Sequence, residues 1–230
     1  MSANHDSRGM PLMEPAPHKG ATLVFCGGSF DPPHQGHAAI ARAAQQAAGP
    51  GAWIVFVPAA RSPHKHSGPA AADSDRIAML RLMASGLDDA CIWTDEIDRA
   101  AWGEASYTID SVRRLREVHP IGEIRLLIGA DQARAFARWR APHDLLKLAP
   151  PLIARRGDDA APLLEELRTC GAWSEEELRL WAKGMLDSPL MDVSSTALRE
   201  ALRGGRSGDL IEQWIDPTVL MYITARGLYL

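Results

Sequence analysis

The chain has 230 residues, of which 46% are hydrophobic and 23% charged, and its formal net charge at pH 7 is −4. This length is enough for one domain with a sizeable core, and the composition is that of an average soluble globular protein. The negative charge gives no global reason to expect binding to nucleic acid or to a membrane surface. No apolar run approaches the roughly 18–20 residues that are needed to span a bilayer.

The cysteines and the first residues indicate the compartment. Cys26, Cys91 and Cys170 are far apart and form no C-x-x-C pair. They predict neither a disulfide framework nor a structural metal site, so we expect a reducing compartment, the cytoplasm. Residues 1–20 are polar and rich in proline, and they lack the apolar stretch of a secretory signal. We expect them to form a disordered tail.

Strand and helix patterns alternate along the first two thirds of the chain. The first predicted strand covers residues 21–28, an apolar run that ends in two glycines, and a helix follows over 37–49. Next come a strand over 52–60, a helix over 73–86, a strand over 91–97, a helix over 107–120, a strand over 123–131, and a helix with a short strand within 144–157. This alternation, with continuous apolar strands, predicts a parallel sheet that is covered on both faces.

The last third of the chain is rich in charged helical patterns. We predict helices within 161–170, 174–186, 194–205 and 216–229. The fold class is therefore α/β, a doubly wound parallel sheet of the Rossmann-like kind with a helical C-terminal cap. We expect a nucleotide-binding domain over 21–157 and a helical part over 158–230 in the same compact unit. The pattern from 157 to 189 indicates no function of its own.

The stretch CGGSFDPPHQGH, from Cys26 to His37, follows the first predicted strand. Open α/β sheets bind ligands at the carboxyl ends of their strands. Gly27 and Gly28 have no Cβ, so a phosphate can approach the backbone there. His34 and His37 lie at the predicted start of a helix, where free N–H groups already favour anions. A metal site is the alternative, but two histidines without a third ligand make a poor zinc site, and phosphate binding is favoured.

This stretch resembles the signature of the nucleotidyltransferase superfamily, whose H-x-G-H element corresponds to His34-Gln35-Gly36-His37. Within that superfamily the chain is most similar to the bacterial nicotinate-nucleotide adenylyltransferases. The resemblance runs from about Leu23 to Tyr229 and includes the elements SYT, IGADQARAFARW and SSTALR. It implies an enzyme that transfers the adenylyl group of ATP to nicotinate mononucleotide and releases pyrophosphate, a step of NAD biosynthesis.

The resemblance also implies roles for single residues. It makes His37 and His34 the catalytic residues, which would bind and neutralise phosphates. The residues implied to bind ATP are Gly28, Ser29, Phe30, Lys65, Gly129, Asp131, Ser194, Ser195, Thr196 and Arg199. The residues implied to bind the mononucleotide are Asp31, Ser106, Tyr107, Thr108, Trp139 and Arg156. In this interpretation Thr108 and nearby backbone amides face the pyridine carboxylate, and Trp139 stacks on the ring.

Several of these residues have ordinary structural interpretations as well. Ser106 and Thr108 are common helix caps, and so is the first hydroxyl of the run Ser194 to Thr196. Two adjacent arginines, as at Arg156, are usually surface charge. Asp31 could orient either the turn or the acceptor, and the sequence leaves both open.

The implied chemistry needs no Ser-His-Asp relay, because a phosphate nucleophile is already an anion. Alignment and charge stabilisation would supply the catalysis. We expect Mg²⁺ to be bound mainly through the ATP phosphates, and no protein metal site is visible in the sequence. The partners would be ATP and nicotinate mononucleotide, with no nucleic acid and no membrane, and an oligomer is possible.

Two alternatives remain open from the sequence. The same fold could act on nicotinamide mononucleotide or on another phosphate acceptor. It could also serve as a non-catalytic nucleotide sensor, although the N-terminal tail is too short for a DNA-binding helix-turn-helix and the net charge is negative.

Overall fold

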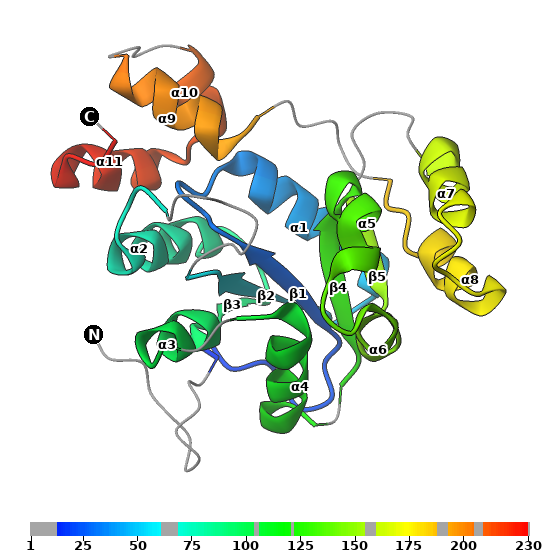
Figure 1. The fold of residues 1–230 in the computed structure, drawn as a ribbon. Coiled ribbons are helices and arrows are strands. Elements are labelled where there is room, and N and C mark those ends of the chain that lie inside the picture. The colour runs from blue at the N-terminus through cyan, green and yellow to red at the C-terminus, as the bar shows by residue number, and fades with distance from the viewer. Residues whose placement is uncertain are drawn as a thin grey trace.

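The structure is a computed structural model that describes residues 13–60, 69–103, 106–120, 122–154, 160–187, 193–204 and 209–229. Five parallel strands form one sheet in the order β3-β2-β1-β4-β5 (Figure 1). The strands are β1 (Leu23–Gly28), β2 (Trp53–Pro58), β3 (Ala90–Ile92), β4 (Ile124–Gly129) and β5 (Pro151–Ala154). The predicted doubly wound parallel sheet is confirmed.

The strand order places a switch point in the middle of the sheet. From β1 the chain builds outward through β2 to β3, and it then returns to place β4 on the other side of β1. Cys26 of β1 pairs with Phe56 of β2 on one side and with Leu127 of β4 on the other. Connections diverge at such a point, which leaves room for a ligand at the carboxyl ends of the two strands.

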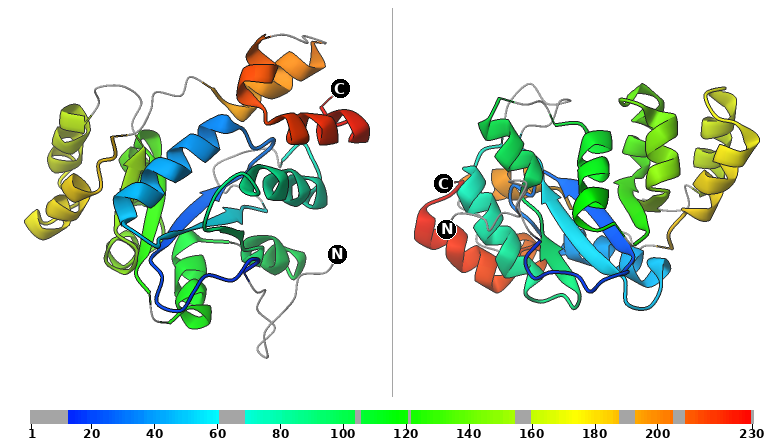
Figure 2. Two further views of the ribbon diagram at one scale, coloured as in Figure 1. Left: turned by 180° about the vertical axis from the view of Figure 1, so that it is seen from behind. Right: turned by 90° about the horizontal axis from the view of Figure 1, so that it is seen from below.

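One face of the sheet is covered by helices from both ends of the chain. They are α1 (Gln35–Ala48), α2 (Asp73–Ala84), α9 (Ser195–Arg203), α10 (Asp209–Trp214) and α11 (Pro217–Arg226), and Figure 2 shows this layer from behind. Val24 of β1 shares its core with Leu198 of α9 and Val219 of α11, all of them fully buried. The C-terminal helices are therefore packed into the same core as the central strand.

The other face carries the central helices. They are α3 (Asp95–Ala101), α4 (Thr108–Val118), α5 (Ala130–Ala135), a 3-10 turn (Phe136–Arg138), α6 (Pro142–Leu148), α7 (Ala160–Thr169) and α8 (Glu175–Lys183). Phe25 of β1 packs into this second core with Ile109 of α4. Helices α7 and α8 lie beyond the β5 edge in Figures 1 and 2. None of the helices on either face, within the described residues, is long and apolar enough to cross a membrane.

The third strand is shorter than predicted. We expected it to continue to residue 97, but β3 ends at Ile92 and α3 begins at Asp95. The first turn of α3 holds three carboxylates, at Asp95, Glu96 and Asp98, and negative charge is favourable there. Helix-terminal electrostatics therefore outweighs the apolar pattern of the segment.

The expected disordered tail is also corrected for its last part. Met13 is buried, and Glu14 exchanges backbone hydrogen bonds of 3.3 and 3.2 Å with Ile92. The indole N–H of Trp53 donates to Nδ1 of His18 over 3.1 Å. Residues 13–18 therefore pack along the β2–β3 side of the sheet, because the edge strand β3 offers free backbone groups for pairing.

Candidate active site

Two adjoining cavities open at the switch point. Their volumes are about 380 and 410 Å³, and both are lined by Gly27, Leu127, Ile128 and Gln132. We call the first the tryptophan cavity; its other lining residues include Ser29, Glu96, Ser106, Tyr107, Thr108, Arg138, Trp139 and Arg140. We call the second the histidine cavity; its other lining residues include His34, His37, Gly129, Asp131, Arg134, Val193 and Ser194.

The two histidines of the histidine cavity are fixed against each other. Helix α1 begins directly after His34, whose backbone N–H donates to Nδ1 of His37 over 3.2 Å. Their ring centroids are 3.8 Å apart, with the planes inclined by 31°. Because Nδ1 of His37 accepts this bond, the neutral ring carries its hydrogen on Nε2. Nδ1 of His34 is buried and has no hydrogen-bond partner in the described part of the chain.

Burial sets the charge of this pair. It lowers the pKa of His34 to about 4. The pKa of His37 lies well below 6.5, first because of burial and second because of the neighbouring His34. Both rings are therefore neutral donors near pH 7. An anionic phosphate beside them would raise both pKa values and favour the charged rings.

Gly36 lets α9 close on the histidine pair. A Cβ at this position would lie 2.8 Å from Cγ1 of Val193 and 2.9 Å from Nδ1 of His34. Any side chain would therefore push away either the residue before α9 or the ring of His34. The glycine of the H-x-G-H element is required by packing inside the site.

Phe30 packs against His37 and lines neither cavity. Its side chain is buried, and its ring lies edge-on at 5.0 Å from His37 and at 5.6 Å from Phe56. A Cβ at Gly28 would lie 3.0 Å from this ring, so the glycine gives Phe30 its room. The ring of Phe30 is thus packed in the core beside His37, and the predicted contact of this residue with ATP stays a prediction.

The opposite wall of the histidine cavity comes from the end of β4. The N–H of Gly129 donates to Oε1 of Gln132 over 2.9 Å. Asp131 is exposed at the rim, with a carboxylate oxygen 3.4 Å from Arg134. Gln132 and Arg134 were not among the predicted site residues, although both lie in the IGADQARAFARW element that carried Gly129 and Asp131.

The predicted phosphate element at α9 divides into one lining residue and two structural ones. Ser194 lines the histidine cavity, and its Oγ accepts the N–H of Ala197 over 3.2 Å as a helix cap. Ser195 instead donates to the carbonyl of Pro32 over 2.9 Å. Thr196 is exposed, and its hydroxyl accepts a hydrogen bond of 3.2 Å within α9. The Ser195 and Thr196 hydroxyls thus have protein partners and line neither cavity.

Asp31 and Arg199 also line neither cavity. The guanidinium of Arg199 donates to the backbone carbonyl of Asp31 over 2.6 Å. The buried carboxylate of Asp31 accepts from the N–H of Ala70, the N–H of Ala71 and the hydroxyl of Tyr229. Of the two roles left open for Asp31, the structure shows contacts for orienting the turn. Because neither residue lines a cavity, the predicted contacts of Asp31 with the acceptor and of Arg199 with ATP stay predictions.

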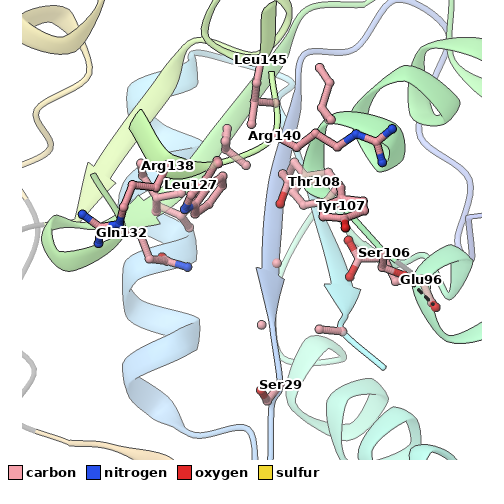
Figure 3. A pocket seen from close by; sticks show the side chains of 18 residues that line it. Ser29, Glu96, Ser106, Tyr107, Thr108, Leu127, Gln132, Arg138, Arg140 and Leu145 are labelled. Carbon is pink, nitrogen blue, oxygen red and sulfur yellow. Dashed lines mark hydrogen bonds between the residues drawn. The ribbon is translucent and has the colours of Figure 1, made fainter. Parts of the chain in front are cut away.

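The tryptophan cavity is walled by the start of α4. Figure 3 shows Ser106, Tyr107 and Thr108 on one side of β1 and Gln132 on the other, with Ser29 at the strand end. The position before α4 is extended, so the helix begins at this wall and its first N–H groups are close to the cavity.

Trp139 forms the other wall and is held by an aromatic stack. Its ring lies 4.8 Å from Phe136, with the planes inclined by 22°. Phe136 in turn contacts Trp173 at 6.0 Å and Trp181 at 5.0 Å. The Nε1 of Trp139 is buried without a partner among the described residues. The α7–α8 region, for which the sequence indicated no function, thus packs behind this wall.

Two arginines beside Trp139 were missed by the sequence analysis. Arg138 and Arg140 line the tryptophan cavity, and the guanidinium of Arg140 lies 4.6 Å above the ring of Tyr107 (Figure 3). The alternating pattern ARWR was the signal available in the sequence. Together they place positive charge beside the predicted pyridine site.

A buried polar network underlies the start of α4, and it was also missed. Ser111 donates to Oε1 of Glu96 over 2.8 Å and accepts from Arg99 over 2.7 Å. Asp95 accepts from Arg99 over 2.8 Å and from Arg114 over 2.7 Å. Burial raises the pKa of Glu96, and the hydrogen bond from Ser111 opposes that shift. The network ties α3 to α4 directly below the cavity.

The described residues give no position for two predicted site residues, and they include no cluster of metal ligands. Lys65 and Arg156 lie outside the described residues. Among the described residues there is no group of three or more His, Cys, Asp and Glu side chains that could hold a metal ion. Asp131 is the single carboxylate that the described chain contributes to the histidine cavity.

Comparison with known proteins agrees with this geometry. The family model described as cytidylyltransferase-like matches residues 25–201. A protein from Rhodopirellula baltica named "Probable nicotinate-nucleotide adenylyltransferase" is 33% identical over 86% of this chain and 90% of its own. A protein of the same name from Stenotrophomonas maltophilia is 34% identical over 90% of this chain and 96% of its own.

Solved structures show the same fold. The nicotinic acid mononucleotide adenylyltransferase of Plasmodium falciparum, solved in complex with NaAD, superimposes with a TM-score of 0.61 over 91% of this chain and 97% of its own, at 18% identity. The resemblance read from the sequence is thereby confirmed. From its motif geometry and its relatives, the chain belongs to the nicotinate-nucleotide adenylyltransferase family, within the cytidylyltransferase-like proteins.

Proposed function

We propose that the protein transfers the adenylyl group of ATP to nicotinate mononucleotide, giving nicotinate adenine dinucleotide and pyrophosphate. The observation that carries this proposal is the pair of cavities that adjoin at Gly27. A reaction that joins two nucleotides needs two sites whose reacting ends meet. The membership of the family supports the choice of substrates.

ATP fits the histidine cavity best. The cavity begins at the first turn of α1, which has 14 residues and free N–H groups at its start. His34 and His37 add neutral ring donors, and an anion beside them raises the pKa of both rings. We assign the triphosphate to these groups, with Ser194 on the facing wall.

The acceptor fits the tryptophan cavity. Trp139 offers a ring for stacking on the pyridine. The start of α4, at Thr108, presents backbone N–H groups to a carboxylate, and Arg140 adds positive charge beside it. This electrostatic setting favours the carboxylate of the nicotinate form over the uncharged carboxamide of the nicotinamide form.

The chemical step needs alignment and charge stabilisation. A phosphate oxygen of nicotinate mononucleotide attacks the α-phosphorus of ATP, and the bond from that phosphorus to the bridging oxygen of pyrophosphate breaks. No proton has to be removed from the nucleophile. The hydrogen on Nε2 of His37 stabilises charge on the phosphates as it develops, and the ring of His34 assists.

The proposal also covers two residues outside the described part of the chain, the metal ion, the compartment and the domain organisation. We assign Lys65 and Arg156 to phosphate binding, as the motif positions imply. Mg²⁺ would be held mainly by ATP phosphates, because Asp131 is the single carboxylate among the described lining residues of that cavity, and it would supply charge neutralisation. We place the reaction in the cytoplasm. We also propose that residues 21–157 and 158–230 act as one compact unit.

The test is pyrophosphate release from ATP and Mg²⁺, measured in parallel with nicotinate mononucleotide and nicotinamide mononucleotide. The expected result is a strong preference for the acid, with turnover of His37→Ala lowered by about 100-fold or more. Equal use of both acceptors would overturn the assigned carboxylate site. ATP binding without pyrophosphate release from either acceptor would favour a nucleotide sensor.

A further inference from the structure

Three segments that are far apart in the sequence meet at Asp31. Its carboxylate accepts the N–H of Ala70 over 2.7 Å and the N–H of Ala71 over 3.1 Å. It also accepts the hydroxyl of Tyr229 over 2.7 Å. The guanidinium of Arg199 donates to its backbone carbonyl over 2.6 Å and lies 3.8 Å from its carboxylate. We call these contacts the Asp31 junction.

The junction joins segments that build or adjoin the histidine cavity. Asp31 precedes His34 in the turn after β1, and Arg199 lies on α9, one turn beyond the cavity residue Ser194. Ala70 lies two residues after the segment 61–68, which contains Lys65. The hydroxyl of Ser195 adds a further bond from α9 to the same turn.

The wall next to the junction has little tolerance for movement. The side chain of Val193 lies so close to Gly36 that a Cβ there would meet it at 2.8 Å. A small shift of α9 therefore changes the distance between Ser194 and the two histidines. The bonds from Arg199 and Ser195 hold α9 at this distance.

We propose that the Asp31 junction is a positioning device, in which Tyr229 and Arg199 act through Asp31 to hold the α9 wall and the residues after 61–68 against the histidine pair. Its kinetic consequence rests on the proposed function, because it requires that ATP occupies the histidine cavity. Tyr229 thereby becomes a positioning residue for ATP, although it lines neither cavity.

The state of Tyr229 agrees with this role. Its side chain is buried, and burial together with the hydrogen bond to Asp31 raises the pKa of its hydroxyl, which therefore stays a donor. Its backbone has φ = 63°, a left-handed conformation that is unfavourable for a tyrosine unless contacts enforce it. The bond to Asp31 is one such contact.

The chain offers a matched control. Tyr222 on α11 donates to the buried carboxylate of Asp75 on α2 over 2.8 Å. This is the same chemical interaction at nearly the same distance, but neither Tyr222 nor Asp75 lines a cavity or touches the β1–α1 turn. Tyr222→Phe removes one tyrosine–carboxylate bond that lies outside the junction.

The experiment compares Tyr229→Phe with Tyr222→Phe in two measurements. Hydrogen–deuterium exchange of the Ala70 and Ala71 amides and of α9 should be faster in Tyr229→Phe and unchanged in Tyr222→Phe. The KM for ATP should rise about tenfold in Tyr229→Phe, from loss of a hydrogen bond to a charged group, while the KM for nicotinate mononucleotide stays at the wild-type value. Asp31→Asn should shift both measurements in the same direction.

The two measurements separate the junction from the proposed function. Unchanged exchange at Ala70, Ala71 and α9 in Tyr229→Phe would overturn the junction. Equal rises of the KM for ATP in both tyrosine variants would overturn its specific role in positioning. Faster exchange in a protein that uses no pyridine mononucleotide would leave the junction standing and refute the proposed function.

Discussion

The backbone N–H of His34 donates to Nδ1 of His37 over 3.2 Å, while the two ring centroids lie 3.8 Å apart. The backbone of His34 thus fixes the tautomer of His37, and a charge on the ring of His34 would lower the pKa of His37. Burial keeps this pair neutral, and a phosphate beside it would raise the pKa of both rings.

The depressed pKa of His34 makes stability depend on pH. In the unfolded chain the pKa is about 6.5, and in the folded chain it is about 4, so the unfolded state binds more protons between these values. The stabilising contribution is complete above pH 6.5 and is lost as the pH falls toward 4.

We therefore expect the free energy of unfolding of the wild type to fall more steeply over this range than that of His34→Asn. The difference should approach about 3 kcal/mol at pH 4, from the linkage of a single group. Urea unfolding at a series of pH values measures it, with the offset at pH 7.5 as the reference. Parallel curves for the two proteins would contradict the buried, neutral state of His34.

Gly36→Ala should inactivate the protein without unfolding it. The new Cβ would lie 2.8 Å from Val193 and 2.9 Å from Nδ1 of His34, so the histidine or the α9 wall must move. A misplacement of a catalytic group by about 1 Å costs about 100-fold in kcat/KM. Pyrophosphate release measures the loss, and far-ultraviolet circular dichroism checks the fold.

Gly86→Ala is the matched control, because its Cβ would meet nothing closer than the carbonyl of Met83 at 3.6 Å. It should keep wild-type kcat/KM. Near-wild-type activity of Gly36→Ala would show that the site accommodates a methyl group and that the packing argument is wrong.

Phe136→Leu should affect one substrate only. It removes the ring stacked 4.8 Å from Trp139 but keeps an apolar side chain in the core. We expect the KM for nicotinate mononucleotide to rise about three- to tenfold, the value of one aromatic pair, and the KM for ATP to stay unchanged. Quenching of tryptophan fluorescence by the mononucleotide gives an independent binding curve. Equal changes in both KM values would mean that the variant loosens the whole site.

Ser111→Ala should destabilise the protein by about 1–3 kcal/mol, because it leaves buried groups of Glu96 and Arg99 without their hydrogen-bond partner. Ser85→Ala is the control, since this exposed serine bonds only the carbonyl of Leu82, and its effect should stay within about 0.5 kcal/mol. Urea unfolding compares the two. Similar values for both would show that the network below α4 contributes little.

The sequence by itself determined the fold class and the place of the site. Continuous apolar strands alternate with helices, and this arrangement has few solutions other than a parallel sheet covered on both faces. Such a sheet puts the residues at the end of each strand on one edge, and His34, after β1, and Gly129, the last residue of β4, line one cavity there. The expected binding of phosphate follows from local features, the N–H groups at a helix start and two imidazole rings, which a short motif contains.

Only the tertiary structure decided which predicted residues line a cavity and which hold one together. Phe30, Asp31, Ser195 and Arg199 belong to the same motifs as the lining residues, but their side chains are used by packing and hydrogen bonds inside the fold. Glu96 reaches the site from a position in α3 that no local pattern marks. The direction of a side chain depends on partners far away in sequence, such as Tyr229 for Asp31, and a motif contains no information about them.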